Sequence, residues 1–580
     1  MSEKPLLLPY PRRLEFTEGS FTSDDAPSAI RLTCALDAMP QSYVLAITPD
    51  GIDLTYRDPA GLYYARQTLG QLIQQYGKTL PAMTITDSPD FLRRGVMLDC
   101  SRDRVPTMAT LYGLIDKLAA WKINEFQLYL EHTYAYPDHR EVWTEASPFT
   151  GEELRALDAY CRAHHIDLVP CQATLGHMER WLKHPRYHDL AEAPDGFVPP
   201  WEQMGKVRAA GTLDPNDEGS LDLVAGLFDA LLPNFTSEFV NICNDEPFEL
   251  GMGKSRAAVE AGGGRVYLDY LLKLYQHITA RGKTVLFWAD IITQHPDLVP
   301  ELPSDIIPLI WGYEDWQPSE EQCKLISSTG LHFYICPGTS SWNTVGGRTA
   351  NALGNLRNAA HLGEKYHARG YLNTDWGDNG HWQALPISYL GFAYGAAVCW
   401  CDASNRDADV PTLLSRFAFA DAAGVMGRIA YDLGNIYQMI PLPQFNSQWL
   451  FHMLQWTDEE VAFHYNQLIF NHGGEPLTRD LIHSVIARIE AILRPLESAQ
   501  MAHEDALIKS EFRLAADLLL HGARRTLRFL GAAPAADATL KAELEALILR
   551  QKQAWLARSR PGGLFDSITR FKGALESYQA

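Results

Sequence analysis

The sequence predicts an α/β fold: a (β/α)8 TIM barrel with a small α+β domain before it and a helical domain after it. Eight short apolar segments alternate with segments of helical periodicity over about 300 residues. Apolar strands of this kind are buried on both faces, as in a parallel sheet covered by crossover helices. A hairpin and one helix precede the alternation, and only helical periodicity follows it.

Residues 1–90 are expected to form the small α+β domain. Residues 40–57, PQSYVLAITPDGIDLTYR, alternate as two short strands around a turn at Pro49-Asp50-Gly51, where glycine permits a positive φ. Residues 60–77 then place apolar side chains at helical spacing and end on Gly77. The first domain should therefore contain at least one hairpin and one helix.

The barrel is assigned to residues 91–400. Its expected strands are GVMLDCS, NEFQLYLEH, IDLVPCQ, FVNICNDE, TVLFWAD, IIPLIWG, LHFYICPG and GYLNTDWGD. Thr150 and Glu153 have the spacing of a capping box, which predicts the start of one of the intervening helices.

An open doubly wound sheet is the alternative to a barrel. Such a sheet would bind ligand only at its switch point, whereas a barrel gathers the carboxyl ends of all its strands at one mouth. Nearly every expected strand ends in polar or aromatic residues, which favours the barrel: Asp99, Glu131, Gln172, Asp245, Trp288, Trp311, Trp376 and Asp378.

Residues 401–580 are expected to form the helical C-terminal domain. The segments LIHSVIARIEAILRPLESA, EFRLAADLLLHGARRTLRFL and LKAELEALILRQKQAWLA all have helical periodicity. Their apolar faces should pack against the barrel, or against a second copy of the chain in a homodimer.

Composition excludes several classes of partner. The chain has 50 Lys and Arg against 71 Asp and Glu, a net charge of −21, which repels nucleic acid and anionic membrane surfaces. The nine cysteines are scattered, and Cys399 and Cys401 lack the two-residue spacer of zinc or redox motifs. We therefore expect reduced thiols and no metal or cofactor. No apolar run approaches the length of a signal-peptide core or a membrane span, so we also expect a cytoplasmic protein.

Two adjacent carboxylates, Asp245 and Glu246, follow the fourth expected strand in FVNICNDEPFELG. Neighbouring side chains on a strand point to opposite faces, so the strand must end here, with Asp245 as its last inward residue. Two carboxylates in different surroundings can keep one ionised while the other acts as a general acid. They could instead be solvated loop acids, but their position at a strand end favours catalysis.

Three tryptophans stand at comparable strand ends: Trp288, Trp311 and Trp376. Each taken alone could equally be ordinary core packing. Together they resemble the aromatic walls that receive the apolar faces of a sugar ring.

With these residues assembled, the chain resembles the family 20 glycoside hydrolases, the β-N-acetylhexosaminidases, and within them the divergent cytosolic branch. The resemblance covers residues 40–400. It depends on RRGVMLDCSR at the first strand, QATLGHMERWLKHP after the third, NDE at the fourth and the tryptophans just named, all in family order. The first 90 residues also resemble the small domain that often precedes this barrel.

The resemblance implies an exo-glycosidase that removes terminal β-linked N-acetylglucosamine or N-acetylgalactosamine from oligosaccharides or glycoconjugates with retention. In this family the substrate's own 2-acetamido oxygen is the nucleophile and forms an oxazolinium intermediate. Glu246 would protonate the leaving oxygen and then activate water, while Asp245 would orient the acetamido group. No cofactor or metal is implied.

The resemblance also implies a set of binding residues. Arg94 and Asp378 would hold ring hydroxyls, His177 would support the acid, and Glu131 matches an acidic residue of the second strand. Trp288, Trp311 and Trp376 would surround the acetamido methyl group and the ring.

The chain departs from the family pattern at two places. Cys243 and Asn244 replace the usual Gly-Gly before the acid pair, which makes Asn244 a candidate substrate contact. The family's seventh-strand tyrosine has no match, and PGTSSWNTVGG offers Trp342 and Asn343 in its place.

Two rival functions predict different sequences. A metal-dependent barrel hydrolase would carry a His-x-His pair on the first strand, and MLDCSRD has none. A non-catalytic sugar-binding barrel would be expected to lose one acid of the pair, and both are present. Hydrolysis is therefore the favoured hypothesis.

Overall fold

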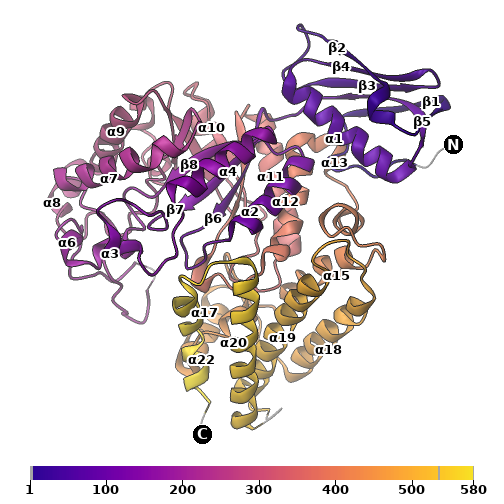
Figure 1. Cartoon of the computed structure of the whole chain (residues 1–580). Coiled ribbons are helices and arrows are strands. Elements are labelled where there is room, and N and C mark those ends of the chain that lie inside the picture. Colours follow the sequence, from indigo (N-terminus) through magenta and orange to yellow (C-terminus); the bar gives the residue numbers. More distant parts are fainter. Residues whose placement is uncertain (1–3, 201, 533–535, 579–580) are drawn as a thin grey trace.

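The computed structural model describes residues 4–200, 202–532 and 536–578. It confirms the predicted fold class: a closed barrel of eight parallel strands, a five-stranded sheet before it and a helical region after it. In Figure 1 the small sheet lies to one side of the barrel, and the C-terminal helices gather below both. The three parts follow one another along the chain.

The N-terminal sheet has the strand order β1-β5-β3-β4-β2. The predicted hairpin is β3 and β4, with Tyr43 paired to Tyr56, and the predicted helix is α1, which begins after the N-cap Asp58 and ends at Gly77. The sequence patterns predicted no strand at β1, β2 or β5. The side chains of β1 and β2 are nearly all exposed and so lack an apolar alternation. The bounds are β1 Arg13–Thr22, β2 Ile30–Cys34, β3 Tyr43–Thr48, β4 Gly51–Tyr56, β5 Thr79–Asp87 and α1 Pro59–Tyr76.

All eight predicted barrel strands are present, and β13 pairs with β6 to close the ring. The strands are β6 Arg93–Asp99, β7 Glu125–Leu130, β8 Asp167–Gln172, β9 Phe239–Asn241, β10 Thr284–Trp288, β11 Ile307–Trp311, β12 Tyr334–Cys336 and β13 Gly370–Asp375. The helices that cover them are α2 Met108–Ala120, α4 Gly151–Ala163, α7 Glu218–Leu231, α9 Arg265–Thr279, α10 Glu320–Ser327, α11 Thr349–Lys365 and α12 Leu385–Trp400. Between β10 and β11 the described chain forms only 3-10 turns, η3 Ile292–Gln294 and η4 Val299–Glu301.

Buried polar contacts join the small domain to the amino end of the barrel. Lys122 Nζ lies 3.0 Å from Asp87 Oδ2, and Trp400 Nε1 donates to Asp87 Oδ1 at 2.9 Å. Arg94 belongs to the same junction: it is fully buried and donates to Gln41 Oε1 at 2.8 Å. The structure therefore contradicts the expectation that Arg94 binds substrate, because Arg94 lies at the amino end of β6 while the barrel mouth lies at the carboxyl ends of the strands.

The C-terminal region packs against the barrel. This was one of the two expected arrangements, the other being packing against a second copy of the chain. Phe571 stacks on Trp382 with ring centroids 3.7 Å apart, and Arg560 pairs with Glu153 of α4 at 2.8 Å. Its main helices are α17 Asp458–Asn471, α18 Arg479–Leu493, α19 Asp505–Phe529, α20 Asp537–Arg558 and α22 Lys572–Glu576. Among the described residues, no helix combines the length and the apolar character needed to cross a membrane.

Candidate active site

The acid pair stands on an irregular segment where the chain turns away after the strand, not on the strand itself. Strand β9 ends at Asn241, four residues earlier than the last inward position expected at Asp245. Cys243, Asn244 and Glu246 then adopt positive φ values of 55°, 62° and 43°. Left-handed conformations of non-glycine residues cost on the order of 1–3 kcal/mol each. They persist only where the surrounding structure holds them, and they cluster at active sites. The turn explains how two adjacent carboxylates can face the same mouth.

Two side chains from neighbouring elements hold this turn. Tyr267 of α9 donates its hydroxyl hydrogen to the carbonyl of Asn244 at 3.0 Å. Asp290, which follows β10, accepts the backbone N–H of Glu246 at 3.1 Å. The strained backbone is therefore fixed from both sides, and the two acids are positioned before any substrate arrives.

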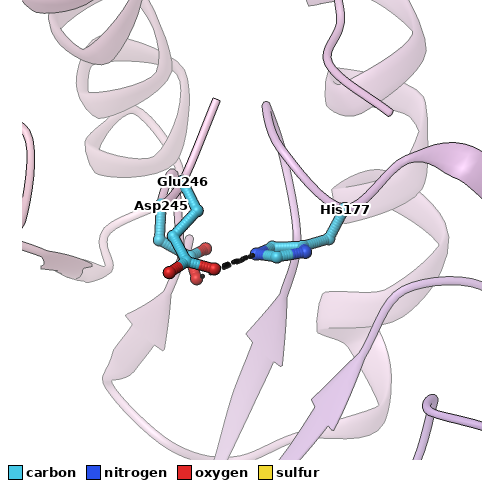
Figure 2. A group of neighbouring side chains, drawn as sticks. All are labelled: His177, Asp245 and Glu246. Atoms are coloured by element: carbon cyan, nitrogen blue, oxygen red, sulfur yellow. Dashed lines mark ion pairs between the residues drawn. The ribbon is translucent and has the colours of Figure 1, made fainter. Parts of the chain in front are cut away.

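His177 lies between the two carboxylates. Its Nε2 is 3.3 Å from Asp245 Oδ2 and 3.4 Å from Glu246 Oε2, and Figure 2 shows the ring approaching both acids from a separate loop. The approach is possible because Gly176 has no side chain: a Cβ there would lie 2.3 Å from the carbonyl oxygen of Asp245.

The charge of His177 is set by opposing effects. Burial lowers the pKa of the imidazole, but the negative charge of Asp245 and contacts with both carboxylates outweigh it, so the pKa is raised well above its ordinary value. Arg102 Nη2 lies 3.4 Å from His177 Nδ1. The imidazolium carries a proton on both nitrogens and so presents an Nε2–H to the carboxylates. A neutral ring that accepts from Arg102 at Nδ1 keeps its single proton on Nε2 and presents the same N–H.

The two acids differ in solvation, as predicted. The side chain of Asp245 is 8% exposed and that of Glu246 is 33% exposed. Asp245 is thus the enclosed member of the pair, and Glu246 is the one that water or a leaving group can reach.

An aromatic pocket surrounds the acid pair. Tyr313 stacks on Trp311 with centroids 5.2 Å apart and meets Trp342 edge-on at 5.1 Å. The indole N–H groups of Trp288 and Trp376 are buried without a hydrogen-bond partner among the described residues. The full lining is Arg102, Asp245, Glu246, Trp288, Trp311, Tyr313, Trp342, Trp376, Asp378 and Asn446.

Arg102 occupies the place that the sequence prediction gave to Arg94. It follows Asp99 at the carboxyl end of β6, pairs with Asp99 at 3.1 Å and lies 3.4 Å from Asp378. Its guanidinium also lies over the ring of Trp376 at 4.8 Å. The segment RRGVMLDCSRD contains both arginines, and only Arg102 follows the strand, so strand direction alone would have distinguished them.

Two other predicted contacts lie outside the pocket lining. Glu131 is buried 3.9 Å from Arg102 and accepts the hydroxyl hydrogen of Tyr129 at 3.1 Å. Burial raises the pKa of Glu131 to about 7, against the opposing charges of Arg102 and His177. Asn244 is fully buried and is not among the residues that line the aromatic pocket.

Sequence reasoning missed Tyr313 and Asn446 as well as Arg102. Tyr313 stands two residues after Trp311 in LIWGY, where the run of strand-end aromatics could have pointed to it. Asn446 belongs to the C-terminal region, and no local pattern connects it with the barrel mouth.

His177, Asp245 and Glu246 are also the described residues whose donor atoms could hold a metal ion, since these atoms all lie within 4.8 Å of one another. Two features oppose that use. The guanidinium of Arg102 already lies beside His177, and the raised pKa of His177 opposes the loss of a proton that metal binding requires. The cluster is better suited to proton transfer than to metal binding.

Two sequence profiles match the chain. Residues 91–374 match "Glycosyl hydrolase family 20, catalytic domain", and residues 12–88 match "Glycosyl hydrolase family 20, domain 2". These regions coincide with the barrel and the small N-terminal sheet, and together they cover more than half of the chain.

Individual relatives share about a quarter of their residues with the chain over the matched regions. The beta-hexosaminidase of Akkermansia muciniphila is 27% identical over 280 residues, 43% of this chain and 55% of that protein. The human beta-hexosaminidase subunit beta is 24% identical over 298 residues, 47% of this chain and 52% of that protein. The chain spans about half the length of these curated relatives. The chitobiase structure from Flavobacterium johnsoniae shares the fold, with a TM-score of 0.57 and 16% identity over 97% of this chain and 98% of that one.

Proposed function

The chain belongs to glycoside hydrolase family 20, and on that premise we propose that it is a β-N-acetylhexosaminidase. The reaction would remove a terminal β-linked N-acetylglucosamine or N-acetylgalactosamine with retention, through an oxazolinium intermediate. One observation carries the proposal: an acid pair bridged by His177 stands inside a pocket of four tryptophans and a tyrosine.

The spacing of the carboxylates supports a nucleophile supplied by the substrate. Two-carboxylate glycosidases place one acid on each side of the scissile bond, about 5–5.5 Å apart for retention and about 6.5–9.5 Å apart for inversion. Here Asp245 and Glu246 each have an oxygen near the same His177 nitrogen, and those oxygens lie within 4.8 Å of each other. A carboxylate nucleophile must stand on the opposite face of the sugar ring from the acid, whereas Asp245 and Glu246 converge on one His177 nitrogen, which supports the acetamido oxygen as nucleophile.

The exposure of the two acids assigns their roles. Glu246, the more exposed, would protonate the leaving oxygen and later take a proton from the incoming water. Asp245, the enclosed acid, would accept the acetamido N–H and stabilise the positive charge that develops on the oxazolinium ring. His177 would keep both side chains in place through its Nε2–H.

The surroundings of Glu246 indicate where the leaving group departs. Glu246 and Trp311 line the aromatic pocket and also a second cavity, whose wall includes Phe248, Gln294 and Gln317. A catalytic acid must face the glycosidic oxygen, so the ring to be cleaved off would occupy the aromatic pocket and the leaving group the second cavity. The amide side chains there suit a neutral sugar.

A cytoplasmic location remains our proposal. It is supported by the acidic charge and by the cysteines, all nine of which are free in the structure. Short glycans already inside the cell would then be the substrates. Detection of the protein in the secreted fraction of its host would refute this location.

The proposed reaction can be tested by exchanging the 2-substituent of an aryl glycoside. We expect turnover of 4-nitrophenyl β-N-acetylglucosaminide or β-N-acetylgalactosaminide, and at least a hundredfold lower kcat/KM for 4-nitrophenyl β-glucoside, which lacks the acetamido nucleophile. A thiazoline analogue of the intermediate should inhibit competitively. Equal turnover of the acetamido and hydroxyl substrates would contradict the mechanism, and binding without turnover would favour a sugar-binding protein.

A further inference from the structure

The aromatic pocket is not made by the barrel alone. Asn446 lines it and comes from the C-terminal region, between η7 (Ile436–Met439) and α16 (Trp449–His452). The other lining residues all stand at or after the carboxyl ends of barrel strands. One residue of the helical region therefore reaches the place where the terminal sugar would bind.

The backbone of Asn446 is held in position by buried charges. Its N–H donates to Glu314 Oε1 at 2.7 Å, and its φ is 51°. Glu314 is in turn paired with Arg348, which donates to Glu314 Oε1 at 2.9 Å and to Oε2 at 2.5 Å. A left-handed residue fixed by a buried ion pair is a preorganised position rather than a mobile loop tip.

The same segment is joined to two further loops of the barrel mouth. Gln448 N–H donates to the carbonyl of Asn343 at 3.3 Å, and Asn379 Nδ2 donates to Asn343 Oδ1 at 3.1 Å. Asn343 follows Trp342, and Asn379 follows Asp378, so this chain of contacts ends at two pocket residues.

The side chain of Asn446 has an unused acceptor. Its Oδ1 is buried and has no hydrogen-bond partner among the described residues. Buried acceptors normally have a donor, and a carbonyl oxygen facing a pocket can accept from a ligand hydroxyl. The pocket therefore contains one acceptor that neither the proposed acid chemistry nor the protein's own contacts employ.

We propose that Asn446 is a substrate-binding residue whose Oδ1 accepts a hydrogen bond from a hydroxyl of the terminal N-acetylhexosamine. This inference rests on the proposed function and makes the C-terminal region part of the sugar site. Asn446 is anchored to the loops after β11 and β12, neither of which neighbours β9 in the barrel. These strands are two and three places from β9 in the eight-stranded ring, so Asn446 is held to one side of Glu246. Because Glu246 must face the anomeric carbon, a hydroxyl away from that carbon, the 4-hydroxyl or the 6-hydroxyl, is the expected partner of Asn446.

The test combines variants of Asn446 with deoxy substrates. We would measure kcat/KM of the full chain for 4-nitrophenyl β-N-acetylglucosaminide and for its 4-deoxy and 6-deoxy analogues. Asn446→Ala should lower kcat/KM for the parent substrate roughly 5- to 10-fold, as expected for one hydrogen bond. Asn446→Asp, which keeps an acceptor oxygen, should retain more activity. Phe445→Ala is the matched control, because Phe445 is the exposed neighbour outside the pocket, and it should stay within about twofold of wild type.

The deoxy analogues decide between a contact and a structural role. If Asn446 accepts from one hydroxyl, Asn446→Ala and wild type should have the same kcat/KM for the deoxy analogue that lacks that hydroxyl. For the other deoxy analogue, Asn446→Ala should still have a lower kcat/KM than wild type. A loss of equal size on all three substrates, or no loss on any, overturns the inference. An inactive wild type would instead refute the proposed function, so the two failures are distinguishable.

Discussion

Separate substitution of Arg94 and Arg102, two of the three arginines in RRGVMLDCSRD, should separate catalysis from stability. Arg102 lines the sugar pocket, and Arg94 lies at the opposite end of the same strand, in the contact with the N-terminal domain. We expect Arg102→Ala to abolish most of the activity. Arg94→Ala should lower stability and leave the activity of the folded protein unchanged.

The size of the Arg102 effect follows from its contacts. Nε lies near Asp378 and Nη1 contacts Asp99, while Nη2 lies 3.4 Å from His177 Nδ1, which can accept from it only when His177 is neutral. At least one N–H on each of Nη1 and Nη2 is therefore left for ring hydroxyls. Two charge-assisted hydrogen bonds of about 1.5–3 kcal/mol each correspond to a loss of roughly 10²- to 10⁴-fold in kcat/KM. Arg102→Lys should lose nearly as much, because an ammonium cannot reproduce the planar fork.

The Arg94 effect is a loss of stability. Its guanidinium donates to the carbonyls of Lys122 and Phe91 at 2.9 and 2.7 Å and to Gln41 at 2.8 Å, all in a fully buried setting. Removing these bonds should lower the free energy of unfolding by about 2–4 kcal/mol.

The assay pairs steady-state kinetics with thermal unfolding of each purified variant. Kinetics on an aryl β-N-acetylhexosaminide should place Arg102→Ala far below wild type at a similar melting temperature, and Arg94→Ala near wild type at a lower one. The reasoning is refuted if Arg94→Ala loses activity without losing stability, or if Arg102→Ala keeps wild-type kcat/KM.

Two further predictions concern the same pocket. The raised pKa of His177 means that its contribution to stability is fully present below its unfolded pKa of about 6.5 and is lost as pH rises through the higher folded value. The difference in melting temperature between wild type and His177→Asn should therefore shrink as pH rises above about 6.5 and through the higher folded pKa of His177, and a difference that stays constant with pH would contradict a charged His177 in the folded state. Tyr313→Phe keeps the stack on Trp311 and removes one pocket hydroxyl, so kcat/KM should fall roughly 5- to 10-fold with little change in melting temperature. Unchanged kcat/KM in Tyr313→Phe would exclude the hydroxyl as a substrate contact.

Local periodicity was sufficient for the fold. All eight barrel strands were predicted because each is a short apolar run bounded by helices or turns, and the capping box at Thr150 and Glu153 is present as expected. The exposed strand β1 was missed because it has no buried face to create a pattern. The barrel could be predicted because the same pattern, a short buried apolar strand followed by a helix, recurs along the chain.

The site was predictable only where strand ends defined it. Asp245, Glu246 and the tryptophans lie at or shortly after the ends of their strands, and the structure brings them together. Arg94 was misplaced because a motif was matched without regard to strand direction. Asn446 reaches the pocket through a hydrogen bond to Glu314, a contact between residues 132 positions apart that no local pattern reports.

The measurement that tests the central claim most directly is the release of 4-nitrophenol from the β-N-acetylglucosaminide and the β-N-acetylgalactosaminide by wild type, Asp245→Asn and Glu246→Gln. The account predicts turnover by wild type and a loss of at least a hundredfold in both variants, each still folded by its melting temperature. The ratio of the two substrates would identify the preferred sugar. A folded wild type that releases nitrophenol from neither substrate, or an Asp245→Asn variant with wild-type kcat/KM, would contradict the account.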